Sequence, residues 1–140
     1  HDVWFDGVAE MLQDLAAQGI QLAVATGKSR KGLDRVLAQT QSHDIFVATR
    51  AASETKSKPD PLMLSEILSV VGVHPEQAIM VGDTSYDLEM AQNIRMPSVG
   101  VTYGVHESHV LEKFNPIALA SDVKALHQLL NHQIKLKESA

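Results

Sequence analysis

Short apolar runs alternate in this chain with stretches whose apolar residues recur at helical spacing, and this alternation limits the folds that the chain can adopt. The predicted strands are residues 20–25, 45–48, 79–82, 98–101 and 117–120. The first predicted helix has Val8, Met11, Leu12 and Leu15 at i, i+3, i+4 and i+7. Strands that alternate with helices of about 10 to 15 residues are typical of parallel βαβ units. The sequence therefore predicts an α/β fold with an open, doubly wound, Rossmann-like parallel sheet.

Polar and glycine residues predict where the helices begin and end. Asp6 and Ser121 are predicted N-caps of the first and last helices, because short polar side chains accept hydrogen bonds from free backbone N–H groups. Gly19 and Gly72 are predicted to end the first and third helices. Residues 135–140 are expected to form a frayed tail.

The size and charge of the chain exclude several classes of protein. With 140 residues, 44% of them hydrophobic, residues 1–140 are expected to form a single domain around one core. The net charge of −5 argues against binding to nucleic acid or an anionic membrane. The absence of cysteine excludes disulfides and fits a cytoplasmic protein. Since the chain does not begin with Met, we expect it to be a processed product or a fragment.

Residues 79–87 combine a strand, a glycine and two acids. The apolar run leads into Gly82, which is expected to let the backbone turn sharply, and Asp83 follows at the strand end. Asp83 and Asp87 would then lie on one side of the first turn of the next helix. Two carboxylates at this spacing suit Mg²⁺ that keeps several waters. The structural alternative is that Asp83 is an N-cap and Asp87 an acid favoured by the helix dipole.

Two further polar turns should meet these acids, because the carboxyl ends of parallel strands share one edge of the sheet. Thr26 and Gly27 follow the strand at residues 20–25 and have the groups that bind a phosphate oxygen. Taken alone, Thr26 is better explained as an ordinary N-cap. Lys58 precedes Pro59, which favours an extended backbone that would aim the amine into the crevice. A lysine in so polar a loop can also be plain surface charge. Together these groups predict phosphoryl-transfer chemistry.

Three stretches in this order resemble motifs of a known family. Residues 22–29, 57–61 and 80–87 resemble the second, third and fourth motifs of the haloacid dehalogenase superfamily. The chain is most similar to the phosphoglycolate phosphatase-like branch, from about residue 5 to residue 130. The resemblance implies a magnesium-dependent phosphatase that hydrolyses a small phosphorylated metabolite through a phospho-aspartate intermediate.

The resemblance also implies a role for each motif residue. Thr26 and the amide of Gly27 would hold the phosphate, and Lys58 would neutralise phosphate and nucleophile. Asp83 would be a direct Mg²⁺ ligand, and Asp87 a second ligand or the holder of a metal-bound water. Thr26, Lys58 and Asp87 are thus the predicted catalytic residues.

The chain departs from the family pattern at its start. The family nucleophile lies in an Asp-x-Asp pair at the end of the first strand, and the 140 residues contain no such pair. Asp2 and Asp6 are poor substitutes, since no strand precedes them. The first, central strand and the cap domain are therefore expected to be missing. Either residues 20–25 and 79–82 close up on each other, or another chain or segment completes the sheet between them. These residues alone are expected to be inactive.

Other readings of the motifs are weaker. A nucleotide-binding P-loop ending in Gly27-Lys28-Ser29 needs a glycine at the position of Leu22. A signalling receiver would carry its acids before its lysine. A degenerate, non-catalytic module that binds phosphate or a protein partner remains an alternative. His106 and His109 are expected to be exposed loop residues rather than metal ligands, and Tyr103 to pack rather than touch substrate.

Overall fold

The computed structural model describes residues 6–103 and 108–138, which alternate between strands and helices as predicted. The strands are β1 (Leu22–Thr26), β2 (Phe46–Ala51), β3 (Met80–Gly82), β4 (Ser98–Val101) and β5 (Ala118–Ala120). The helices are α1 (Val8–Ala17), α2 (Arg30–Thr40), α3 (Leu62–Val71), α4 (Ser85–Gln92), α5 (Ser108–Leu111) and α6 (Val123–Glu138). Among the described residues, no helix has the length and hydrophobicity of a membrane span.

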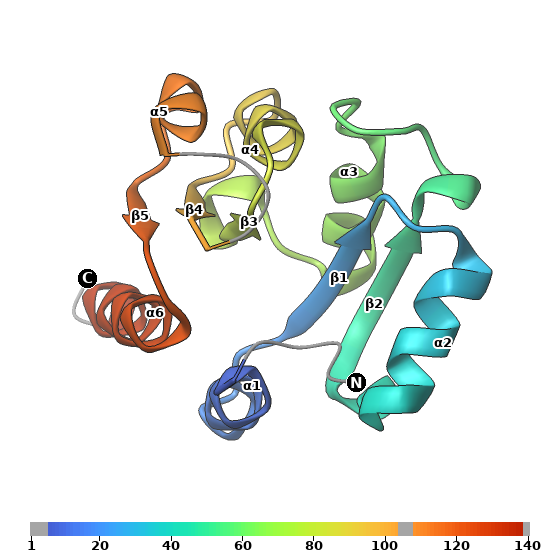
Figure 1. Cartoon of the computed structure of the whole chain (residues 1–140), viewed down its shortest axis with the longest axis horizontal. Coiled ribbons are helices and arrows are strands. Elements are labelled where there is room, and N and C mark those ends of the chain that lie inside the picture. The colour runs from blue at the N-terminus through green and yellow to red at the C-terminus, as the bar shows by residue number, and fades with distance from the viewer. Residues whose placement is uncertain (1–5, 104–107, 139–140) are drawn as a thin grey trace.

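The strands form two separate parallel sheets (Figure 1). One sheet pairs β1 with β2, and the other has the order β3-β4-β5. The prediction that the strands at 20–25 and 79–82 close up on each other is therefore wrong, because β1 and β3 are not hydrogen-bonded neighbours. The chain forms an α/β fold with its central sheet interrupted between β1 and β3.

Helices cover both faces of the strands, as a doubly wound fold requires. Helices α1 and α6 pack on β4 and β5 through a buried cluster. Helices α3 and α4 form a second cluster that also contacts β1 and β3. Helix α2 packs on β1 and β2 through a third. The side chains at the centres of these clusters are Met11, Leu15, Val99 and Leu126 in the first, Met63, Leu64 and Met90 in the second, and Leu33 and Leu37 in the third. Shared contacts with α3 and α4 thus hold the two sheets together.

Hydrogen bonds centred on Asp14 join the first helix to the last. The carboxylate of Asp14 lies 2.6 Å from Nε2 of His127 and also accepts hydrogen bonds from Gln18 and Asn131. The hydrogen bond with His127 is the main reason why the pKa of Asp14 is lowered. This network fixes α1 against α6.

Several predicted helix and strand ends were wrong by one or a few residues. Gly7, in the left-handed region at φ 90°, precedes α1 in place of the predicted cap Asp6, and Asp122 rather than Ser121 accepts the capping hydrogen bond of α6. The second strand begins at Phe46, because His43–Ile45 forms a 3₁₀ turn. Helix α6 continues to Glu138 through most of the predicted tail. Gly72 ends α3 at φ 83°, as predicted.

Candidate active site

A pocket of about 480 Å³ lies at the carboxyl ends of β1 and β3, where the sequence predicted the polar turns to meet. Of the predicted site residues, Thr26, Gly27, Lys58 and Asp83 line it directly. Asp87 does not line the pocket, but it forms an ion pair with Lys58, which does. Turns separated by more than 20 residues in sequence therefore meet at one edge of the fold.

Thr26 is not the N-cap of α2, so the alternative explanation of Thr26 as an N-cap is wrong. The N-cap of α2 is Ser29, whose hydroxyl accepts the N–H of Gly32 at 3.1 Å. The hydroxyl of Thr26 instead accepts the N–H of Lys28 at 3.1 Å, at the end of β1. Because a hydroxyl group is also a donor, Thr26 can donate a hydrogen bond to an anion in the pocket. Gly27 is exposed, and a Cβ there would meet no heavy atom within 4 Å.

Lys58 and Asp87 form a largely buried ion pair. The amine of Lys58 donates to Oδ1 of Asp87, and the two side chains are only 16% and 6% exposed. The Lys58–Pro59 peptide bond is cis. The prediction that Lys58 points into the crevice agrees with its place in the pocket lining, and the reading as a solvated surface charge is wrong.

The other oxygen of Asp87 closes the start of α4. Thr84 is the N-cap, and its hydroxyl accepts the N–H of Asp87 at 3.2 Å. Oδ2 of Asp87 in turn accepts hydrogen bonds from the hydroxyl of Thr84 at 3.0 Å and from its N–H at 3.3 Å. This reciprocal arrangement is a capping box. Asp83, which precedes Thr84, is therefore not the N-cap, and the structural explanation for it is wrong.

The two acids differ in what they can offer to a metal ion. Asp83 is half-buried in the pocket lining, whereas both oxygens of Asp87 are engaged, one by Lys58 and one by Thr84. Among the described residues, no group of three or more His, Asp or Glu side chains could hold a metal ion. Mg²⁺ needs only one or two protein carboxylates when water and phosphate fill its other positions. Asp83 fits a direct ligand of this kind, and the metal roles of both acids stay predictions.

Glu54 connects the loop that carries Lys58 to the start of α2. Arg30, the first residue of α2, donates to both carboxylate oxygens of Glu54, at 3.0 and 2.7 Å. Glu54 also accepts the N–H of Ala51 at 3.0 Å. These interactions, with Arg30 first, lower the pKa of Glu54 from 4.5 to about 2. They connect the turn after β1 to the segment that leads to Lys58.

We expect Glu54→Gln to destabilise the protein by about 1 kcal/mol at neutral pH, because Glu54 is about a third exposed and solvent screens its pair with Arg30. A folded-state pKa below the unfolded one gives stability that is full above about pH 4.5 and is lost as the pH falls toward about 2. The difference between wild type and variant should therefore shrink over that window. Urea unfolding at several pH values measures it, and a constant difference would contradict the assigned pair.

The structure adds pocket residues that the sequence analysis missed. Lys28, Ser57, Thr84 and Tyr86 also line the pocket, and Tyr86 is 54% exposed. A threonine three residues before an acid is the sequence signature of a capping box, so the role of Thr84 as N-cap could have been predicted from the sequence. The other three lie inside the motif stretches at residues 22–29, 57–61 and 80–87, but the sequence analysis gave them no role.

Tyr103, His106 and His109 were predicted to have no direct role in the site. Tyr103 packs against the cluster between α1, α6 and β4, as predicted. Its pKa is raised, first by burial and then by the negative charges of Asp122 and Asp83. His109 is exposed, as predicted, but it lies in helix α5 and not in a loop. His106 lies outside the described residues.

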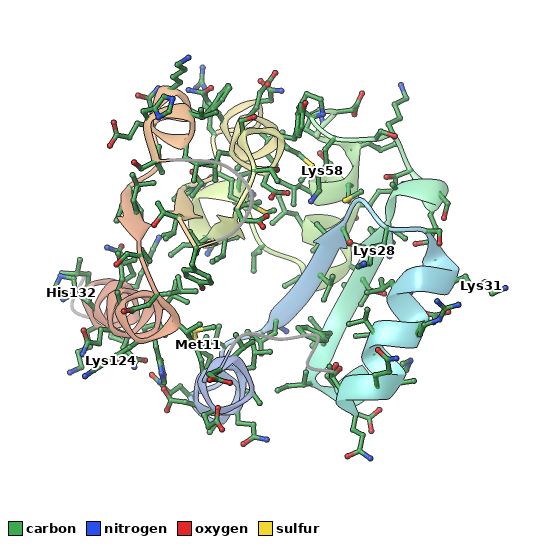
Figure 2. The ribbon with its side chains drawn as sticks, viewed as in Figure 1. Met11, Lys28, Lys31, Lys58, Lys124 and His132 are labelled. Atoms are coloured by element: carbon green, nitrogen blue, oxygen red, sulfur yellow. The ribbon has the colours of Figure 1, made fainter. Side chains whose placement is uncertain are left out.

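Figure 2 shows Lys28 and Lys58 near the carboxyl end of β1, whereas Lys31 points outward from α2. The pocket therefore offers a hydroxyl donor, two ammonium groups and one accessible carboxylate within one crevice. Such a set can bind a phosphate together with a cation.

Comparison with known proteins identifies relatives with this chemistry in their names. The chain is 31% identical over 125 residues to a phosphoglycolate phosphatase of Psychrobacter arcticus, covering 89% of this chain and 54% of that protein. It is 30% identical over 116 residues to the pyrophosphatase PpaX of Halalkalibacterium halodurans, covering 80% and 53%. The chain spans about half the length of the curated relatives it matches.

A solved structure has the same fold as this chain, and a family model shows which family the chain belongs to. A crystal structure of a predicted phosphoglycolate phosphatase from Haemophilus somnus superposes with a TM-score of 0.83 at 26% identity, covering 90% of this chain and 56% of that one. The model of the haloacid dehalogenase-like hydrolases matches residues 2–101. The chain belongs to the haloacid dehalogenase-like hydrolase family.

Proposed function

We propose that this chain forms the phosphate- and magnesium-binding part of a phosphomonoester hydrolase that acts on a small phosphorylated metabolite. The observation that carries the proposal is the pocket in which Thr26, Lys58 and Asp83 meet from three separate turns. Relatives named as phosphatases support the same reaction class. The absence of cysteine makes the cytoplasm the expected location.

Each residue has one task in this proposal. Thr26 and the amide of Gly27 donate hydrogen bonds to phosphoryl oxygens, and Lys58 supplies positive charge beside them. Asp83 binds Mg²⁺, which when bound would neutralise negative charge on the phosphate. Asp87 holds the amine of Lys58 in place and keeps the first turn of α4 closed. If Asp87 also holds a metal-bound water, as the resemblance implies, it would do so with oxygens that already accept hydrogen bonds from Lys58 and Thr84.

The nucleophile must come from outside these 140 residues, because they contain no Asp-x-Asp pair. In the proposed route, one aspartate of the missing Asp-x-Asp pair attacks phosphorus, the bond to the ester oxygen breaks, and the second aspartate gives the leaving alcohol its proton. That second aspartate then takes a proton from water, the water oxygen attacks phosphorus, and the bond from phosphorus to the first aspartate breaks, which releases phosphate and restores the carboxylate. The interruption between β1 and β3 would accept a strand from another segment or chain that carries this aspartate. The 140 residues by themselves would bind phosphate without turnover.

Phosphate binding and hydrolysis can be measured separately on the chain. Addition of orthophosphate with Mg²⁺ should shift the amide ¹H–¹⁵N resonances of Thr26, Gly27 and Asp83. Asp83→Asn should make phosphate binding independent of Mg²⁺. Asp44→Asn is the control, because Asp44 is an exposed acid just before β2, at the end of that strand away from the pocket, and its loss should leave the Mg²⁺ dependence of phosphate binding unchanged. Absence of phosphate binding in wild type would reject the proposed function.

Hydrolysis of p-nitrophenyl phosphate by a mass-verified sample gives the second readout. We expect no magnesium-dependent release of p-nitrophenol above the rate in chelator. Turnover would show that another residue of this chain acts as nucleophile. The alternative, a non-catalytic module that binds phosphate or a protein partner, is favoured if the coding sequence upstream of these residues contains no Asp-x-Asp strand.

A further inference from the structure

Two walls of the pocket come from segments that follow the paired strands β1 and β2. Residues 26–28 after β1 form the first wall, and Ala52, Ser57 and Lys58 after β2 form the second. A phosphate bound as proposed above contacts both walls at once. Its affinity therefore depends on how firmly the protein holds one wall relative to the other.

The segment that forms the second wall has little apolar packing to hold it. Four of the five residues at 53–57 are exposed. At the far end of this segment, the amine of Lys58 is bound by Asp87 of α4. The position of its near end therefore depends on polar contacts more than on burial.

The start of α2 lies beside the end of β2 (Figure 1), and Arg30 there supplies these polar contacts. Its backbone N–H donates to the hydroxyl of Ser53 at 3.0 Å. Its Nε and Nη2 donate to the two carboxylate oxygens of Glu54, at 3.0 and 2.7 Å. Nη2 also donates to the carbonyl and hydroxyl oxygens of Thr49, at 3.2 and 3.1 Å. The guanidinium group thus ties the second wall to β2 and to α2.

Arg30 is connected just as closely to the first wall. Only Ser29, the N-cap of α2, separates it from Lys28. The carbonyl of Lys28 accepts the N–H of Ala52 at 3.0 Å, which is a direct bond between the two walls. Since Arg30 itself does not line the pocket, it can act on a bound phosphate only through the residues that do.

We propose that Arg30 is a positioning residue, which sets the phosphate contacts of residues 26–27 at a fixed separation from that of Lys58. This inference rests on the proposed function, because it assumes that these residues hold the phosphate. Arg30 acts through its planar fork and not by attracting the phosphate, since Glu54 and Asp34 already balance its charge. Loss of the fork should displace one wall and cost one charge-assisted hydrogen bond to phosphate, which is about tenfold in affinity.

Arg30→Lys separates positioning from charge. Lysine keeps the positive charge, but it cannot donate to both oxygens of Glu54 in a fixed planar geometry. The amide resonance of Gly27, titrated with orthophosphate in the presence of Mg²⁺, gives the Kd of phosphate. We expect Arg30→Lys and Arg30→Gln each to raise this Kd about tenfold. Wild-type affinity in Arg30→Lys together with a loss in Arg30→Gln would mean a purely electrostatic effect, and would overturn the proposal.

Glu54→Gln tests whether Arg30 acts through its pair with Glu54. It should also weaken phosphate binding, by up to about tenfold. The double variant Arg30→Gln/Glu54→Gln should bind phosphate no more weakly than Arg30→Gln alone, because both changes break the same pair. Losses that multiply in the double variant would overturn the pair as the positioning device. Should Arg30→Gln not fold, Arg30→Lys and its double variant with Glu54→Gln carry the same test.

Two control variants account for lost charge and for lost stability. Arg35→Gln removes an exposed positive charge from the same helix, and Asp14→Ala removes hydrogen bonds between α1 and α6 outside the pocket. Both should keep the Kd of phosphate within about twofold of wild type. A tenfold loss in Asp14→Ala would mean that stability alone governs binding, and would overturn the role of Arg30.

The outcomes also separate this inference from the proposed function. Circular dichroism verifies that each variant is folded under the conditions of the titration. Unchanged phosphate affinity in the folded Arg30 variants would overturn the positioning role and leave the proposed function intact. Absence of phosphate binding in wild type would overturn both.

Discussion

Asp87→Ala is expected to lower the free energy of unfolding by about 3 kcal/mol, the low end of the cost of removing one partner of a buried ion pair. Asp87 is 4% exposed, and its loss leaves the amine of Lys58 without its carboxylate. The variant also loses the hydrogen bonds between Asp87 and Thr84 that close the first turn of α4. Urea denaturation followed by circular dichroism measures the change.

Asp83→Ala is the matched control, because it removes the other acid of this turn without removing the partner of Lys58 or Thr84. Asp83 lies four residues earlier in the same turn and lines the pocket, but it is not the helix cap. We expect it to change stability by no more than about 0.5 kcal/mol. Asp87→Asn should fall between the two, because an amide can still accept from Thr84 but cannot pair with an ammonium group. Equal stability of Asp87→Ala and Asp83→Ala would contradict a structural role for Asp87.

The order of strands and helices could be predicted from the sequence because it depends on local periodicity. Leu33, Val36 and Leu37 predict α2, and they need no knowledge of distant residues. The convergence of Thr26, Lys58 and Asp83 followed from one topological rule, that parallel strands end at a common edge. Thus the position of the site was predictable before its contacts were.

Contacts between distant residues were not predictable in the same way. The sequence gives no sign that Lys58 pairs with Asp87 rather than with Asp83, since both acids are close to the same turn. The predictions of two helix caps were wrong for a similar reason. Gly7 and Asp122, the neighbours of Asp6 and Ser121, are also residue types that precede helices, and the local sequence does not choose between them. The sequence left open whether β1 and β3 would pair with each other, and the structure places them in two separate sheets.

Gly82 illustrates a residue whose importance was predicted for the wrong physical reason. The sequence suggested a sharp turn, yet Gly82 is the last residue of β3, and the described glycines with positive φ are Gly7, Gly19 and Gly72. A Cβ at Gly82 would lie nearest to Cβ of Asp87, and 2.7 Å from Oδ2 and 2.8 Å from Cγ of the same residue. The glycine is required by the close approach of Asp87, and not by backbone conformation.

Gly82→Ala is therefore expected to cost about 2 to 3 kcal/mol, because the added methyl group must displace a carboxylate that Lys58 and Thr84 hold from two sides. Gly27→Ala is the matched control, since a Cβ there meets no atom within 4 Å, and it should change stability by about 0.5 kcal/mol or less. In the Asp87→Gly background, Gly82→Ala should cost less than in wild type, because the clashing Cβ, Cγ and Oδ2 atoms of residue 87 are all gone. A double-mutant cycle of unfolding free energies tests this coupling. Additive costs would mean that Gly82 and Asp87 act independently, and the steric explanation would be lost.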